Sequence, residues 1–403
     1  MRTYASNTIE KGIAFQDCLV AMLICLNPLA WIFSFLPGGM VTICLIIWFS
    51  FFFFCLFRRK SFITKPLIAL SYILLLFFTK DFIIQSDNEY LLRYFVNFLA
   101  LGILGYRFGF LNISVERVLR YVCAISLLIL PYLATLDVSS FLSETGGVDY
   151  GAWMGISYGI VRFISALILY LLFYSQNRFQ KTLIVFILVL YILFFMLYAS
   201  RGAIVAILIM LIMAYLIKEE NKKRRIFKVF IISIIIFIVA ISLDSIIKSI
   251  YNQFQYYGID SFFIEKMMSM VDGSEGFSNG RSDLNKVAIL GIIERPLFGN
   301  GIAVFEKPND GYVHNVFLQI FYELGLVPFI YYVTLFVLSL KVVLFSNYTK
   351  DIRIYIAFLF CSGCVELLFS STFWTSQIFW IFLGVTTNVI MRKRVVAPLL
   401  YGS

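Results

Sequence analysis

The sequence predicts an all-α protein that crosses a membrane many times. Of its 403 residues, 61% are apolar and only 14% are charged, whereas an ordinary globular domain has about 45–50% and about 25%. The mean hydropathy of +0.91 agrees with this composition. A water-soluble fold of this length cannot bury so much apolar surface. The composition therefore excludes soluble enzymes, disordered scaffolds and DNA-binding proteins.

Twelve apolar stretches are long enough to be transmembrane helices, since a span needs about 20 mainly apolar residues. In chain order they lie at 15–35, 40–57, 63–79, 91–106, 118–136, 154–174, 182–199, 203–217, 226–244, 324–344, 354–370 and 376–391. No second domain and no sequence repeat interrupts this series. We expect a single integral membrane domain over residues 1–403, with about 12 transmembrane helices.

The basic residues indicate how the chain is oriented. Most of the 33 Lys and Arg residues fall in one set of loops, for example at 58–60, 222–228 and 392–394. Loops rich in Lys and Arg remain in the cytoplasm, so both termini are predicted to be cytoplasmic. Most of the 23 acidic residues fall on the opposite face. The net charge of +10 is thus mainly a topology signal and does not indicate a nucleic-acid partner.

The expected outer face carries one long segment, at about 245–323. Its Ser282 or Asp283 is suited to cap a helix that Pro296 would end, and the glycines at 299–301 predict a turn. Aromatic and Met side chains precede that helix and predict short amphipathic helices in the membrane interface. They are Tyr251, Phe254, Tyr256, Tyr257, Phe262, Phe263, Met267 and Met268.

Three arginines and the single histidine lie on this outer face, against the positive-inside trend. Arg162 falls within the sixth candidate span, Arg201 in the turn between the seventh and eighth, and Arg281 in the long segment. His314 stands just before an apolar helix. Inserting an arginine at membrane depth costs at least about 2.5–3.5 kcal/mol of free energy, so such a residue usually has a partner or a function. Snorkelling to headgroups or pairing with an outer carboxylate would explain any one of the arginines, and a capping role would explain the histidine. The four residues together are harder to explain in these ways.

This set of residue types suits the chemistry of a lipid pyrophosphate. Guanidinium groups stay charged and bind phosphate oxygens with two parallel hydrogen bonds. A neutral imidazole can accept the proton of a sugar hydroxyl, and the positive end of the helix that follows His314 disfavours the imidazolium form. We therefore predict a pyrophosphate-binding arginine cluster with His314 as the general base. No Asp-x-Asp and no His/Cys cluster with metal-ligand spacing occurs in the sequence.

The order of these motifs resembles the O-antigen polymerase and O-antigen ligase superfamily. The resemblance covers roughly 180–345 and rests on Ser200-Arg201-Gly202 at the start of an apolar helix, on Arg281 followed by 296–301, and on 314–319 followed by 323–325. In the N-terminal half, only the hydropathy and the stretch MGISY at 154–158 are similar to the polymerases.

The resemblance implies a metal-independent glycosyltransferase of the GT-C type without a cofactor. Arg201 and Arg281 would bind the pyrophosphate of a glycan-carrying undecaprenyl pyrophosphate, and His314 would activate the acceptor hydroxyl. Arg162 joins the donor-binding set on physical grounds alone, and Ser200, Tyr158 and Asn315 are expected to support the site. The site would face the periplasm from the bacterial inner membrane.

The acceptor distinguishes the alternatives. A polymerase transfers the glycan to the next lipid-linked repeat unit, whereas a ligase transfers it to lipid A–core. We favour the polymerase because of the stretch at 154–158 and the Phe- and Ile-rich spans. Membrane lipids and a chain-length regulator protein are the further partners expected. A lipid-linked oligosaccharide flippase is the alternative of another class, but the polar residues gather on one face rather than near the midplane.

Overall fold

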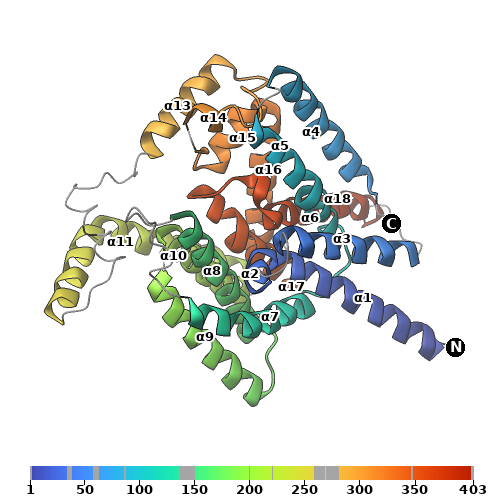
Figure 1. The fold of residues 1–403 in the computed structure, drawn as a ribbon. Coiled ribbons are helices and arrows are strands. Elements are labelled where there is room, and N and C mark those ends of the chain that lie inside the picture. Colours follow the sequence, from blue (N-terminus) through green and yellow to red (C-terminus); the bar gives the residue numbers. More distant parts are fainter. Residues whose placement is uncertain are drawn as a thin grey trace.

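The computed structural model describes residues 2–33, 39–57, 63–85, 88–136, 150–198, 200–219, 221–257, 268, 281–309, 311–345 and 348–400, and these form helices joined by turns and loops, without a strand. The prediction of an all-α fold is confirmed (Figure 1). The elements are α1 (Arg2–Ile24), α2 (Leu26–Ile32), α3 (Gly39–Phe57), α4 (Lys65–Ile84), α5 (Glu89–Asn97), the π-helix η1 (Phe98–Gly102), α6 (Ile103–Phe108), α7 (Val115–Thr135), α8 (Tyr150–Phe173), α9 (Arg178–Tyr198), α10 (Arg201–Lys218), α11 (Lys222–Tyr256), α13 (Arg281–Glu294), α14 (Glu306–Asn309), α15 (Val316–Leu324), α16 (Leu326–Phe345), α17 (Lys350–Leu359), the π-helix η3 (Phe360–Cys364), the 3-10 helices η4 (Glu366–Leu368) and η5 (Phe373–Thr375), and α18 (Gln377–Leu400).

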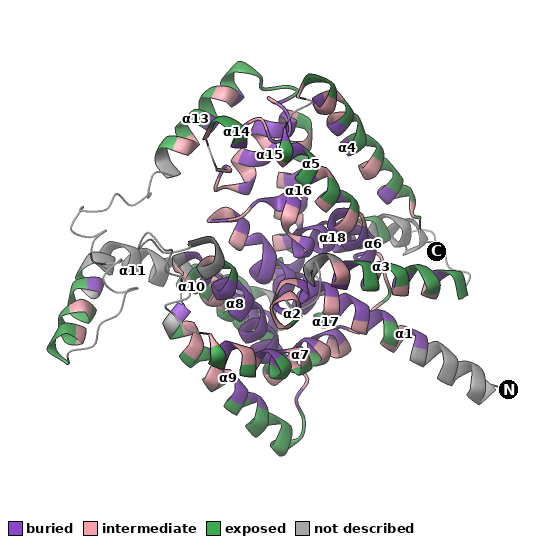
Figure 2. Ribbon diagram, in the orientation of Figure 1, coloured by how far each residue is buried: buried purple, intermediate pink, exposed green. Residues whose placement is uncertain are grey.

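Helix α8 lies at the centre of the bundle. In the apolar part of this helix, within Met154–Phe173, 83% of the residues are buried inside the protein. The helix packs against α7, α9, α10 and η3. Figure 2 shows buried residues concentrated on α8 and its neighbours, while α4 and α9 expose most of their surface. Exposed apolar residues on such outer helices suit contact with lipid.

The described residues contain six helices that are long and apolar enough to cross a membrane, or seven if α1 and α2 form one bent span. The protein is therefore a multi-pass membrane protein. Two further expected spans, 40–57 and 203–217, correspond to shorter apolar helices, and the side chains at 233–244 of α11 lie outside the described residues. The total of twelve spans remains a prediction.

Two expected spans are interrupted. The stretch at 15–35 is bent by 76° between α1 and α2, where Pro28 has no N–H with which to bond the carbonyl of Ile24 four residues earlier. The stretch at 354–370 starts as α17, widens into η3 and ends in η4. Hydropathy alone does not reveal either interruption, because both stretches are continuously apolar.

The long segment at 245–323 is only partly as expected. Helix α13 ends before Pro296 as predicted, although it begins at Arg281, one residue earlier than Ser282. The predicted turn is present, with positive φ angles of 70° at Gly299 and 113° at Gly301. The first part of the expected interfacial region instead continues α11 as far as Tyr256, whereas Phe262, Phe263 and Met267 lie outside the described residues.

Candidate active site

Arg162 is buried in the middle of α8, with a side chain only 5% exposed. Its Nη1 donates a hydrogen bond to the Ile24 carbonyl at 3.1 Å. Because Pro28 has no N–H, that carbonyl lacks its usual helical donor, so the bend between α1 and α2 supplies an acceptor for the arginine. The interruption of the first span therefore contributes directly to the site.

Glu366 is the acidic partner of Arg162. Its Oε2 lies 4.0 Å from Nη2 of the arginine, and its side chain is 17% exposed. Glu366 stands at the start of η4, where the regular helix of α17 has ended. Glu366 was not among the site residues expected from the sequence. An ionisable residue in an apolar stretch is the signal that would have identified it.

Arg162 and Glu366 both face a cavity of about 500 Å³. Its other walls come from α2, α5 and the chain between η4 and α18: Asn27, Glu89, Leu92, Arg93, Val96, Asn97, Ser371, Thr375, Ser376 and Gln377. Glu89, Arg93 and Asn97 recur every four residues, which places them on one face of α5. Ten of the twelve lining residues carry an amide, hydroxyl or charged group, as is expected of a site for sugars and phosphates.

The Ser200-Arg201-Gly202 motif forms the start of α10 and lies against α8. The Ser200 hydroxyl caps α10 by accepting from the Ala203 N–H at 3.3 Å. The Ser157 hydroxyl accepts from the Ser200 N–H at 2.9 Å. Arg201 is the first residue of α10, and its side chain lies outside the described residues.

Gly202 brings this motif next to Tyr158, one helical turn from Arg162. A Cβ atom at position 202 would overlap the Tyr158 hydroxyl oxygen and would lie 3.0 Å from Cβ of Phe369. Only glycine lets α10 start this close to α8. The backbone of Arg201 is thereby held at the face of α8 that also carries Arg162.

His314 lies on a short segment that is attached to the cavity wall. The hydroxyl of Tyr312 accepts a hydrogen bond from the Ser371 N–H at 2.9 Å, and the Tyr312 and His314 rings lie 4.6 Å apart. Asn315 caps α15 by accepting from the Phe317 N–H at 3.0 Å, so His314 precedes the cap instead of opening the helix itself. The cavity lining does not include His314.

Arg281 is placed only through its helix. It is the first residue of α13, and its side chain lies outside the described residues. Leu284, three positions later, packs against a small core that includes Val313. Leu284 of α13 and the segment that carries His314 therefore meet the same core.

A buried polar network that the sequence did not reveal fixes α15 in place. Glu323 accepts hydrogen bonds from Gln319 Nε2 at 2.8 Å and from Trp374 Nε1 at 2.7 Å, and Gln319 also donates to the Thr372 hydroxyl at 2.7 Å. Thr372 follows Ser371 directly, so this network and the Tyr312 contact join α15 to the same loop. Burial raises the pKa of Glu323 well above its usual range, and the nearby Glu306 raises it further.

Glu306 is the second buried carboxyl group of this region. Its Oε1 accepts a hydrogen bond from the Tyr94 hydroxyl at 2.8 Å. Burial raises its pKa to about 7. Within the described residues, no group of three or more His, Cys, Asp and Glu side chains is arranged to hold a metal ion. Metal independence remains an expectation from the resemblance.

Comparison with known families now adds to this geometry. Residues 186–333 match the family described as O-Antigen ligase. This match supports the similarity of that segment to the O-antigen ligase and polymerase superfamily. The superfamily resemblance is thus confirmed, and this superfamily consists of glycosyltransferase-like enzymes. A search of the curated proteins found no match.

The matched segment includes Arg201, Arg281 and His314 but not Arg162 or Glu366. None of the residues that line the cavity falls within the matched segment, which reaches the cavity wall through the contact of Tyr312 with Ser371. A function of the O-antigen ligase or polymerase type in lipopolysaccharide biosynthesis follows in general terms. The roles of the individual residues are proposals.

Proposed function

We propose that the protein is an O-antigen-type polysaccharide polymerase of the bacterial inner membrane. It transfers a glycan from undecaprenyl pyrophosphate to the non-reducing end of another lipid-linked repeat unit, on the periplasmic side. The observation that supports this best is that the segment matched by the family contacts both the helix that carries Arg162 and the wall of the Arg162 cavity. Gly202 lies against Tyr158 on α8, and Tyr312 is bonded to Ser371 in the cavity wall.

The chemistry divides between a base and a set of cations. His314 takes the proton of the acceptor hydroxyl while that oxygen bonds to the anomeric carbon of the donor. The bond from this carbon to the pyrophosphate oxygen breaks, and the pyrophosphate leaves with the electron pair, still attached to its lipid. Arg201, Arg281 and Arg162 stabilise the charge that develops there. The proton ends on His314, and no metal takes part.

Three further residues position these groups. Ser200 caps the helix that begins at Arg201, and Asn315 caps the helix that follows His314. Tyr158 supports the close approach of Gly202 to α8. Membrane lipids surround the site, and a chain-length regulator protein is the partner that this function would require to set the length of the product.

One observation favours a polymerase and another favours a ligase. The polymerase-like stretch at 154–158 contacts the site, because Met154 Sδ lies 3.3 Å from the Ser370 hydroxyl beside the cavity. The matched family, however, is described as O-Antigen ligase. A ligase that transfers the glycan to lipid A–core is therefore the second candidate, and the two differ only in the acceptor.

The test uses purified protein in liposomes that contain undecaprenyl-pyrophosphate-linked repeat units alone. We expect a ladder of glycolipid multiples on a gel, because the donor also serves as the acceptor. A product that forms only after lipid A–core is added would instead identify a ligase. If no product forms under either condition, both enzymatic functions are contradicted and the flippase is favoured.

Variants assign the residue roles in the same assay. His314→Ala should lower the rate by about 10²–10⁴-fold, as is typical when a general base is lost. Lys286→Gln is the control, since its exposed side chain pairs with Asp283 on the surface of α13. If a folded His314→Ala protein polymerises at the normal rate, His314 is not the base.

A further inference from the structure

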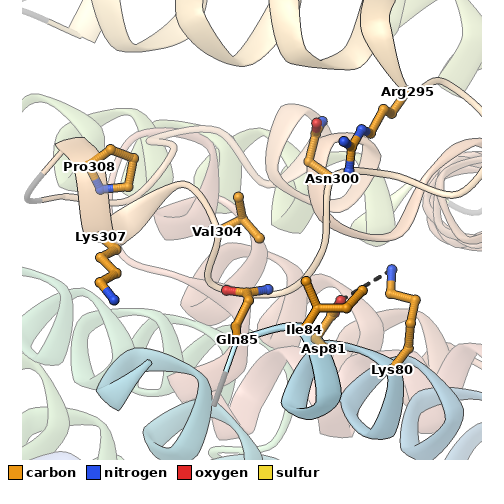
Figure 3. A pocket seen from close by; sticks show the side chains of 9 residues that line it. All are labelled: Lys80, Asp81, Ile84, Gln85, Arg295, Asn300, Val304, Lys307 and Pro308. Atoms are coloured by element: carbon orange, nitrogen blue, oxygen red, sulfur yellow. Dashed lines mark ion pairs between the residues drawn. The ribbon is translucent and has the colours of Figure 1, made fainter. Parts of the chain in front are cut away.

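A second cavity, of about 420 Å³, lies apart from the Arg162 site. Its lining comes from the end of α4, the chain that follows α13, and α14: Lys80, Asp81, Ile84, Gln85, Arg295, Asn300, Val304, Lys307 and Pro308. None of these residues lines the Arg162 cavity. Figure 1 shows α4 and α13 converging at the top of the molecule, and Figure 3 shows the lining side chains arranged around the pocket.

The pocket has an excess of positive charge. Lys80, Arg295 and Lys307 contribute three cations and Asp81 one anion. Asp81 lies 3.2 Å from the Lys80 ammonium, and its other oxygen accepts a hydrogen bond from the Ile302 N–H at 2.8 Å. Within the described part of the chain, neither Arg295 nor Lys307 forms a salt bridge. Two exposed cations therefore remain available for an anionic ligand.

The loop that forms one wall is held rigidly. Asn300 Nδ2 donates to the Gly291 carbonyl at 2.8 Å, and Asn88 Nδ2 donates to the Ala303 carbonyl at 2.9 Å. At Gly301, where φ is +113°, a Cβ atom would lie 2.8 Å from Oδ1 of Asp81. The cationic residues thus flank a preorganised wall, which reduces the entropic cost of binding a ligand.

Exposed apolar residues border the cations on both sides. Ile83 and Ile84, at the end of the lipid-facing helix α4, are 80% and 71% exposed. On the other side, Ile293, Leu297 and Phe298 are also exposed. A group of cations bordered by exposed apolar side chains fits the boundary between headgroups and hydrocarbon. Such a boundary suits a phosphate-bearing headgroup with a hydrocarbon chain.

We propose that this pocket binds the pyrophosphate headgroup of a second polyprenyl-linked molecule, the acceptor. The assignment rests on the proposed polymerase function. In that reaction the acceptor is extended at its non-reducing end, while its pyrophosphate is attached at the opposite end of its glycan. The acceptor headgroup therefore cannot occupy the donor site and needs cations of its own.

The experiment counts the lipids bound to the full-length protein by native mass spectrometry, with sugar-free undecaprenyl pyrophosphate as the probe. Wild type should bind two carriers per chain. Arg295→Gln/Lys307→Gln should weaken the second carrier at least about tenfold, because hydrogen bonds to charged groups are lost. Lys80 is left unchanged because it pairs with Asp81. The control Lys248→Gln/Lys286→Gln removes the same charge from exposed lysines outside both cavities and should still bind two.

Several results would overturn the proposal. Equal carrier counts for wild type and for the Arg295/Lys307 variant would show that the pocket binds no carrier. An equal loss of phosphatidylglycerol would indicate a general anionic-lipid site, and a loss of inorganic pyrophosphate with the carrier retained would exclude a lipid ligand. The count requires no turnover, so it is independent of the polymerisation ladder. A ladder with only one bound carrier refutes the second site alone, whereas two bound carriers without a ladder refute the polymerase.

Discussion

Replacing Gly202 with Ala tests whether the close approach of α10 to α8 positions the active site. The added Cβ would overlap the Tyr158 hydroxyl oxygen and lie 3.0 Å from Cβ of Phe369. Tyr158 is buried, with 3% of its surface exposed, so its ring has little space to move aside. The start of α10, and with it the backbone of Arg201, must shift.

The size of the shift gives the expected loss. Restoring an ordinary carbon–oxygen contact of about 3.5 Å requires a displacement of more than about 1 Å. A misplacement of about 1 Å in a catalytic constellation can cost about 10²-fold in rate. Overpacking of this kind typically costs about 1–3 kcal/mol of stability. We therefore expect Gly202→Ala to lose about 10²-fold in polymerisation rate while the protein remains folded.

A double variant separates this explanation from a general folding defect. Tyr158→Phe removes the oxygen atom that the new Cβ would meet. Tyr158→Phe/Gly202→Ala should therefore be faster than Gly202→Ala alone, with a coupling of about 0.5–3 kcal/mol. The close Phe369 contact remains, so rescue should be partial.

The assay is the initial rate of ladder formation in liposomes, with the apparent Tm of each variant measured alongside. Two results would refute the reasoning. One is a Gly202→Ala protein with the wild-type rate, and the other is a double variant no faster than Gly202→Ala at equal Tm. Either would mean that the approach of α10 to α8 does not position the catalytic groups.

Three further substitutions test other contacts of the site. The Glu366→Gln protein should bind inorganic pyrophosphate several-fold more tightly and should have a lower Tm, because Arg162 loses the opposing charge at 4.0 Å. An unchanged affinity for pyrophosphate, measured by calorimetry, would exclude Arg162 from the donor site. Pro28→Ala gives the Ile24 carbonyl a helical N–H donor that competes with Arg162. The polymerisation rate should therefore fall about tenfold with little change in Tm. A normal rate would mean that the hydrogen bond from Arg162 to the Ile24 carbonyl is dispensable. Burial raises the pKa of Glu306 from 4.5 to about 7 in the folded protein, so its contribution to stability should decrease as the pH rises from 4.5 through 7. Glu306→Gln should therefore flatten the fall in Tm between pH 5 and 8, and a curve parallel to that of the wild type would contradict this.

The local features of the fold followed from the sequence because local chemistry determines them. Pro296 ends α13 and the glycines at 299–301 form the turn, since the missing N–H and the positive φ angles act within a few residues. Glu366 was different. Its pairing with Arg162 depends on how α17 and η3 pack against α8, and hydropathy reports only which residues are apolar.

The candidate site shows the same division. The Ser-Arg-Gly motif and His314 could be identified from the sequence. Their connection to one cavity could not be predicted from it. That link consists of single contacts between distant segments, for example Tyr312 with Ser371 and Gly202 with Tyr158. The residues Glu89, Arg93 and Asn97 did carry a usable signal, because polar groups four apart in a transmembrane stretch predict a polar helix face.

The position of the buried ion pair explains why the matched segment alone would not form the site. Arg162 has 5% of its side chain exposed, and a charge buried to that degree needs both an acceptor and a counter-ion. The acceptor is a carbonyl freed by Pro28 in the first helices, and the counter-ion is Glu366 near the end of the chain. Both lie outside residues 186–333, which contribute Arg201, Arg281 and His314. The cavity is therefore lined by the parts of the chain that precede and follow the matched segment, and a fragment limited to residues 186–333 would lack Arg162 and both of the groups that stabilise its charge.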